Sequence, residues 1–111
     1  MQILAIEREL TIPPHANLPE LLREEAACVW ALQKEGVIRE IWFTGAEPRA
    51  VVLLECASAA AARDHLASLP LVRHGLIDFT LHPLRSYDGF ERLLGSARSG
   101  PAPAREEPAE Y

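Results

Sequence analysis

Cysteine and closely spaced histidine are scarce in this chain. Its two cysteines, Cys28 and Cys56, lie far apart and outside any CxxC pattern, and its four histidines show no HxH or HExxH spacing. Zinc knuckles, redox pairs and histidine metal sites all need such spacings. We therefore expect no metal and no cofactor, and we interpret the cysteines as small buried hydrophobic residues.

Clustered positive charge and long apolar runs are also missing. The chain has 11 basic and 16 acidic residues, a net charge of -5, and no Lys/Arg cluster of the kind that nucleic-acid binding requires. No apolar run approaches the roughly 20 residues that span a bilayer. Met1 leads directly into a strand-like segment without the basic start of a signal peptide. The sequence predicts a cytoplasmic protein with no nucleic-acid or membrane partner.

The 111 residues are enough for one domain, and their hydrophobic patterns alternate between strand and helix. Asn17, as N-cap, and Glu20 form a potential capping box at the start of the first helix, and Gly36 ends it. Ser58 can cap the second helix, which Leu69-Pro70 is expected to end. We predict strands over 2–9, 37–44, 50–56 and 76–84, and helices over 17–36 and 58–68.

The order β-α-β-β-α-β predicts a ferredoxin-like α+β fold, with an antiparallel four-stranded sheet and two helices on one of its faces. We expect Ile41 and Phe43 on the other face, which a second copy would cover to give a homodimer or a higher homo-oligomer. A short C-terminal helix is predicted over 87–94, which completes a domain of residues 1–94. Residues 95–111 have the Pro, Ala, Ser and Glu bias of a disordered tail.

Several segments are similar to the muconolactone isomerase family, in a resemblance that covers roughly residues 1 to 85. They are Leu32-Gln33-Lys34-Glu35-Gly36, Arg39-Glu40-Ile41-Trp42, Ser58, Leu69-Pro70-Leu71 and Ile77-Asp78-Phe79. The resemblance implies a dimeric α+β barrel, a cavity for a small cyclic substrate, and isomerase chemistry. Related barrels include cofactor-free monooxygenases and proteins with no known activity, so the fold leaves the reaction open.

Three residues are candidates for proton transfer, which moving a double bond within a lactone requires. Glu7 interrupts an apolar strand face, where it is either a base with a raised pKa or a strand-end carboxylate paired with Arg39. Asp78 and His82 share one face of the last strand but lie roughly 13 Å apart. His82 can exchange protons near neutral pH, or it can be a solvent-facing or dimer-contact residue.

Four residues are candidates for substrate binding. Arg39 can hold a substrate carboxylate through its guanidinium or form a structural ion pair instead. Trp42 and Tyr87 can wall a pocket for a flat ring or simply belong to the core or the dimer interface. His74 either lies at a cavity mouth or is a plain loop residue, and His15 and His65 are given no role.

The leading hypothesis is a cofactor-independent enzyme that transfers protons on a small cyclic lactone or aromatic-derived acid. The alternatives are a cofactor-free monooxygenase of the same fold and a non-catalytic small-ligand-binding or dimerisation module. Convergence of Glu7, Arg39, Asp78 and His82 on one cavity would favour proton chemistry, whereas an apolar cavity would favour the alternatives.

Overall fold

The computed structural model describes residues 1–10 and 17–95, and its elements follow the predicted order. They are β1 (Gln2–Glu9), α1 (Leu18–Lys34), β2 (Ile38–Phe43), β3 (Ala50–Glu55), α2 (Ala59–Ala67), α3 (Pro70–Arg73), β4 (Ile77–Pro83) and the 3₁₀ helix η1 (Gly89–Leu94). Pro70 does more than end a helix, because it begins the additional turn α3. A proline fits there, since the first N–H groups of a helix have no partner within it. Apart from Gly95, the predicted tail lies outside the described residues.

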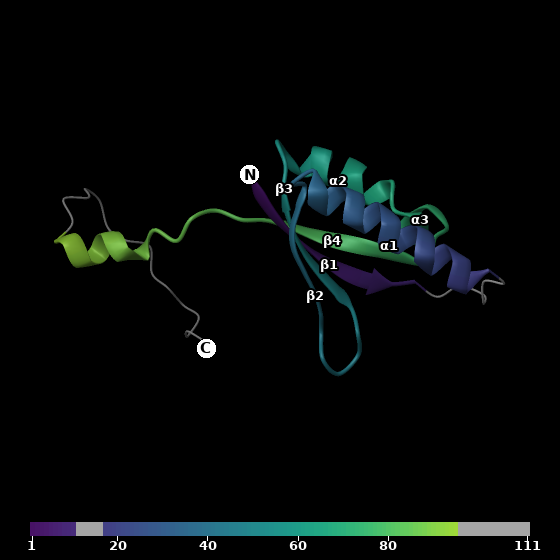
Figure 1. Ribbon diagram of the computed structural model, residues 1–111. Coiled ribbons are helices and arrows are strands. Elements are labelled where there is room, and N and C mark those ends of the chain that lie inside the picture. The colour runs from purple at the N-terminus through teal and green to yellow at the C-terminus, as the bar shows by residue number, and fades with distance from the viewer. Residues whose placement is uncertain (11–16, 96–111) are drawn as a thin grey trace.

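The four strands form one antiparallel sheet in the order β2-β3-β1-β4. Helices α1, α2 and α3 lie together on one side of this sheet, and no helix covers its other side among the described residues (Figure 1). This arrangement confirms the predicted ferredoxin-like α+β fold.

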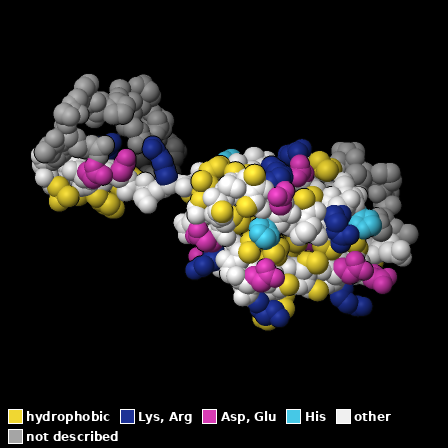
Figure 2. Space-filling view, turned by 90° about the horizontal axis from the view of Figure 1, so that it is seen from above, with side chains coloured by type: hydrophobic (Ala, Val, Ile, Leu, Met, Phe, Trp, Pro, Cys, Tyr) yellow, Lys and Arg dark blue, Asp and Glu magenta, His cyan; other side chains and the backbone are white. Residues whose placement is uncertain are grey.

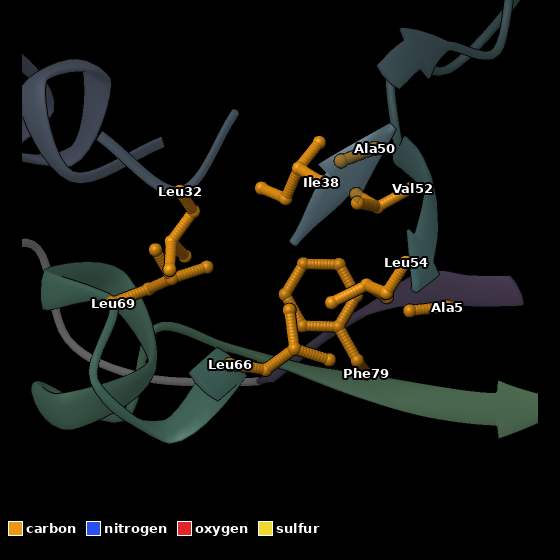
Figure 3. Packing of buried hydrophobic residues seen from close by; sticks show 9 residues of the cluster. All are labelled: Ala5, Leu32, Ile38, Ala50, Val52, Leu54, Leu66, Leu69 and Phe79. Carbon is orange, nitrogen blue, oxygen red and sulfur yellow. The ribbon is translucent and has the colours of Figure 1, made fainter. Parts of the chain in front are cut away.

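The core lies between the helices and the sheet. Ile3 and Ala5 of β1 and Leu54 of β3 are completely buried, because alternate residues of a strand point to the same face. Phe79 of β4 and Leu66 of α2 belong to the same packed cluster as Ala5 and Leu54, and they join it from the edge strand and the helical layer (Figure 3). The buried face of the sheet is thus built from the apolar alternation that the sequence shows.

A register irregularity in β2 reverses the facing of the residues that follow it. Ile38 lies opposite Leu54, but Glu40 rather than Arg39 lies opposite Leu53, so one additional residue is inserted in β2. As a result Ile41 pairs with the buried Val52 and points to the helices.

The same shift places Phe43 opposite the buried Ala50, while Trp42 pairs with Val51 on the uncovered face. The prediction that Ile41 and Phe43 lie on the uncovered face is therefore wrong, because a one-residue bulge exchanges the two faces of a strand.

The segment after β4, residues 84–95, is here called the C-terminal arm. It leads away from the sheet and ends in η1, which the structure forms close to the predicted short helix (Figures 1 and 2). Tyr87 and Phe90 contact each other edge to face, and both are about two-thirds exposed. Leu93 and Leu94 are also exposed, so the arm presents apolar side chains that the rest of the described chain does not cover.

Candidate functional site

A cavity of about 320 Å³ lies between α1 and the sheet. This volume is at the lower end of the range for small-molecule sites, roughly 300–1,000 Å³. Two glutamates stand in an otherwise apolar wall. The lining residues are Glu7, Leu22, Glu25, Ala26, Val29, Ile38, Ile41, Phe43, Ala50, Val52, Leu66, Leu69, Leu71, Ile77 and Phe79.

Glu7 reaches this cavity from the last part of β1. It continues the helix-facing alternation of Ile3 and Ala5, which explains its inward direction. The β1–β3 pairing runs from Gln2 to Ile6, and the next residue along β3 is Ala50. The Ala50 N–H donates to Oε1 of Glu7 at 2.7 Å. The Glu7 side chain thus satisfies a backbone donor just beyond the end of this pairing.

Glu25 reaches the cavity from the opposite wall, on the sheet-facing side of α1. Its Oε1 accepts a hydrogen bond from the backbone N–H of Leu71 at 2.9 Å. Leu71 lies in the first turn of α3, where backbone N–H groups have no partner within the helix. Glu25 therefore links α1 to α3 and is held at the cavity wall.

The environment of Glu25 raises the pKa of its carboxyl group. Burial is the largest cause, since it disfavours the charged form. The Leu71 N–H works against this, while the nearby Glu7 carboxylate raises the pKa further and Arg73 lowers it. Glu7 and Glu25 are therefore electrostatically coupled across the cavity.

When two carboxyl groups interact in an apolar cavity, one can act as a general acid and the other as a general base. Each glutamate uses Oε1 for a backbone N–H, and Oε2 takes no part in that bond. One carboxylate can accept a proton from carbon while the other, in its protonated form, donates a hydrogen bond to a carbonyl oxygen.

Asp78 and His82 lie elsewhere. Asp78 accepts from Arg8 at 2.8 Å and from Arg63 at 3.2 Å, in a cluster of ion pairs at the β4 edge of the sheet. His82 is exposed on the uncovered face, opposite Leu4 of β1. With Glu7 and Thr80 it borders a second, shallow depression on that face. Of the three predicted catalytic residues, only Glu7 lines the apolar cavity.

The four predicted binding residues are not brought together at the cavity either. Arg39 is exposed at the β2 bulge, and its charge helps to lower the pKa of Glu55, whose main partner is the N-terminal amine at 2.7 Å. Trp42 faces the uncovered side of the sheet, and Tyr87 lies on the C-terminal arm. His74 is exposed directly after α3.

The sequence reasoning missed Glu25, although a signal for it exists. Leu18, Leu22, Val29 and Leu32 lie on one side of α1 at steps of three and four residues, and Glu25 is the charged residue that occupies this stripe. A charge at such a position is a departure from the pattern of a core-facing helix. That departure makes Glu25 a candidate site residue.

Residues 1–10 and 17–95 contain no group of three or more His, Cys, Asp or Glu side chains arranged to hold a metal ion. Within the same ranges, no helix has the length and apolar character needed to cross a membrane.

Comparison with known proteins supports a relationship over most of the chain. Residues 5–89 match the family model for muconolactone delta-isomerase. The crystal structure of a muconolactone isomerase superposes with a TM-score of 0.68 at 22% identity, covering 90% of this chain and 98% of that chain.

A second solved structure is that of a 5-chloro-2-hydroxyhydroquinone dehydrochlorinase from Burkholderia phenoliruptrix in complex with 2,5-dihydroxybenzoquinone. It has a TM-score of 0.57 and 15% identity, and the match covers 80% of this chain and 98% of that one. A comparison with curated protein sequences finds no significant match.

Proposed function

Because the chain belongs to the muconolactone delta-isomerase family, we propose that it moves a proton between carbon atoms of a small cyclic lactone or related aromatic-derived acid. The observation that carries this proposal is the pair Glu7 and Glu25 in one apolar cavity. The reaction needs a base that removes a proton beside a carbonyl group, and a hydrogen-bond donor to the carbonyl oxygen. A carboxylate can be the base, and a protonated carboxyl group can be the donor.

In this proposal Glu7 is the base and Glu25 is the acid. The carboxylate of Glu7 removes a proton from the carbon beside the carbonyl group, and the electron pair of that C–H bond moves into the ring to form an enolate. Protonated Glu25, favoured by its raised pKa, donates a hydrogen bond to the enolate oxygen. Return of the proton from Glu7 to a different carbon completes the double-bond shift.

The structural neighbours support the substrate class, since one is named as a muconolactone isomerase and the other holds 2,5-dihydroxybenzoquinone, a small oxygenated ring. The size of the cavity suits such a ring. The proposal also includes a cofactor-independent reaction, a cytoplasmic location and a homodimer. The apolar residues on the uncovered sheet face support the dimer.

The test is deuterium exchange from solvent into a panel of butenolides and related ring lactones, followed by NMR. We expect Glu7→Gln to lower the exchange rate about 10²–10⁴-fold, the usual contribution of a general base. Glu25→Gln keeps a hydrogen-bond donor but loses the titrating proton. It is expected to slow exchange less and to remove the fall in rate at high pH that accompanies ionisation of Glu25.

Matched controls come from neighbouring glutamates. Glu9→Gln changes the same strand outside the cavity, and Glu24→Gln changes the adjacent, exposed position of α1. His82→Ala tests the histidine that the sequence suggested. All three should keep wild-type exchange, and an unchanged rate in Glu7→Gln would remove Glu7 from the mechanism.

Two other functions are supported by one observation: a cofactor-free monooxygenase and a small-ligand carrier. Apart from Glu7 and Glu25 the cavity is apolar, as an oxygenase or carrier would require. Oxygen consumption with a ring substrate, in the absence of deuterium exchange, would support the oxygenase. Tight binding without turnover would support the carrier.

A further inference from the structure

The apolar cavity has no cation in its lining, as far as residues 1–10 and 17–95 form it. No Lys, Arg or His side chain of these residues stands in the cavity wall. A carboxylate carried by a substrate ring would lose hydration there without gaining a partner, which is costly in an apolar site. A ring that carries an acid group therefore needs a cation next to this cavity.

Glu7 marks the place where such a cation lies. It lines both the apolar cavity and the shallow depression on the uncovered face, and no other described residue lines both. The backbone pairing of β1 with β3 stops at Ile6 and Val51, and the Glu7 side chain binds the next N–H of β3, that of Ala50. The two hollows therefore adjoin at Glu7, where the pairing of these strands ends.

Arg49 lines the depression and comes directly before Ala50 in the chain. Its backbone is fixed, because its N–H donates to Oγ1 of Thr44 at 3.0 Å and its carbonyl oxygen accepts from the Thr44 N–H at 2.9 Å. Its guanidinium is held less firmly, by ion pairs to Glu47 at 3.5 Å and to Glu9 at 3.9 Å. Both glutamates are exposed, and such pairs contribute little. The guanidinium can therefore exchange these partners for another carboxylate.

Two other basic side chains of the depression are less suitable. Arg8 donates to Asp78 at 2.8 Å, so its use by a substrate would break a hydrogen-bonded ion pair. His82 lies opposite Leu4, three residues before Glu7 on β1, which is about 10 Å along the strand. Arg49 is thus the cation of this depression that is both loosely held and next to the residue that binds Glu7.

We infer that Arg49 binds the carboxylate of an acidic substrate whose ring lies in the apolar cavity, with Glu7 between the two. This inference rests on the proposed function and names the residue that recognises the acid group. The planar guanidinium can bind both oxygens of a carboxylate. Its charge also offsets the repulsion between that carboxylate and an ionised Glu7. Because the ring is held by apolar contacts and the acid group by Arg49, the substrate is oriented towards the base.

The decisive comparison uses an acid and its neutral analogue: a butenolide bearing an acetic acid side chain, and the primary amide of this compound. Arg49→Gln should raise the KM of the acid for deuterium exchange about 10–100-fold, the usual loss of a charge-assisted hydrogen bond. The kcat of the acid and the KM of the amide should each change less than about threefold, because the contact is the same in the ground state and the transition state. Arg49→Lys keeps the charge but not the fork of donors, and its KM for the acid should lie between those of wild type and Arg49→Gln.

A purely structural role of Arg49 in the hairpin would change the kinetics of the acid and the amide equally, and this result would overturn the inference. Arg23→Gln is the matched control, because Arg23 is exposed on α1 and lines neither hollow. It should leave both KM values unchanged. A larger rise in the KM of the acid in Arg8→Gln than in Arg49→Gln would assign the anchor to Arg8 and also overturn the inference.

Binding measurements separate this inference from a failure of the proposed function. If wild type exchanges deuterium into neither compound, the proposed proton transfer fails, and titration calorimetry of the acid and the amide still tests Arg49. A Kd that Arg49→Gln raises for the acid alone supports the anchor. Equal effects on both compounds, or no effect on the acid, overturn it. Normal exchange of the acid by Arg49→Gln would overturn the anchor and leave the proposed function intact.

Discussion

Glu25 occupies a position that disfavours its ionised form, and this affects the stability of the fold as well as the chemistry. Burial raises its pKa above the ordinary value of 4.5, and the Glu7 carboxylate adds to this effect. The folded protein therefore holds this proton more tightly than the unfolded chain does. The stability from protonated Glu25 is complete below pH 4.5 and is lost as the pH rises through the raised pKa.

Glu25→Gln should consequently stabilise the protein at neutral and alkaline pH. The amide oxygen can still accept the Leu71 N–H, while the cost of burying a charge disappears. We expect the melting temperature of Glu25→Gln to exceed that of wild type at pH 8 and to approach it towards pH 4. Differential scanning calorimetry across this range checks the prediction.

Glu24→Gln is the control for this pH series, because position 24 is exposed and outside the cavity. A melting-temperature difference between Glu25→Gln and wild type that is flat from pH 4 to pH 8 would contradict the assigned environment of Glu25. Stabilisation together with slower exchange is the pattern expected of a residue kept for function at the expense of stability.

At the scale of the elements, α2 depends on its N-cap to hold Leu66 against the cavity. Oγ of Ser58 accepts a hydrogen bond from the Ala61 N–H at 3.0 Å, as the sequence predicted. Ser58→Ala should lower the free energy of unfolding by about 1 kcal/mol, and Ser58→Asp, which also caps well, should restore most of it. Urea denaturation measures both, and equal stability of all three proteins would contradict the role of the cap.

The elements were largely predictable because each has a local cause. Strand alternation, the Ser58 cap and the loop between β2 and β3 identify the β-α-β-β-α-β order without long-range information. The expected capping box of α1 is not formed, since the Asn17 side chain makes no capping hydrogen bond.

The site was predicted less well, for two physical reasons. Glu7 was found because it interrupts a strand face, and Glu25 interrupts the α1 stripe in the same way but was not singled out. The bulge in β2 determines on which face of the sheet Arg39, Ile41 and Trp42 lie, and no residue type in that strand indicates a bulge. The cavity combines residues of all four strands and of α1, α2 and α3, and a local sequence pattern does not reveal such long-range proximity.

At the scale of the whole molecule, two apolar surfaces are left uncovered by residues 1–10 and 17–95, the part of the chain that the structure describes. The first is the sheet face opposite the helices, where Leu4, Ile6, Val51 and Leu53 are partly buried and Trp42 is 53% exposed. The second is the C-terminal arm with Tyr87, Phe90, Leu93 and Leu94 (Figure 2). Large contiguous apolar patches mark interaction surfaces, and the proposed homodimer would use the sheet face.

Because of the bulge in β2, the Trp42 side chain lies on the uncovered face of the sheet. A substitution at Trp42 therefore tests the proposed dimer. Trp42→Asp puts a charge on the uncovered face and should yield a monomer or a protein that dissociates at micromolar concentration in size-exclusion chromatography with light scattering. Phe43→Asp is the matched control, because the next residue along the strand points to the helices and lines the cavity. It should keep the dimer and instead weaken ring binding.

A dimer that survives Trp42→Asp and dissociates in Phe43→Asp would show that the two copies do not meet through the uncovered face. A wild-type chain that is monomeric at all concentrations would exclude the dimer itself.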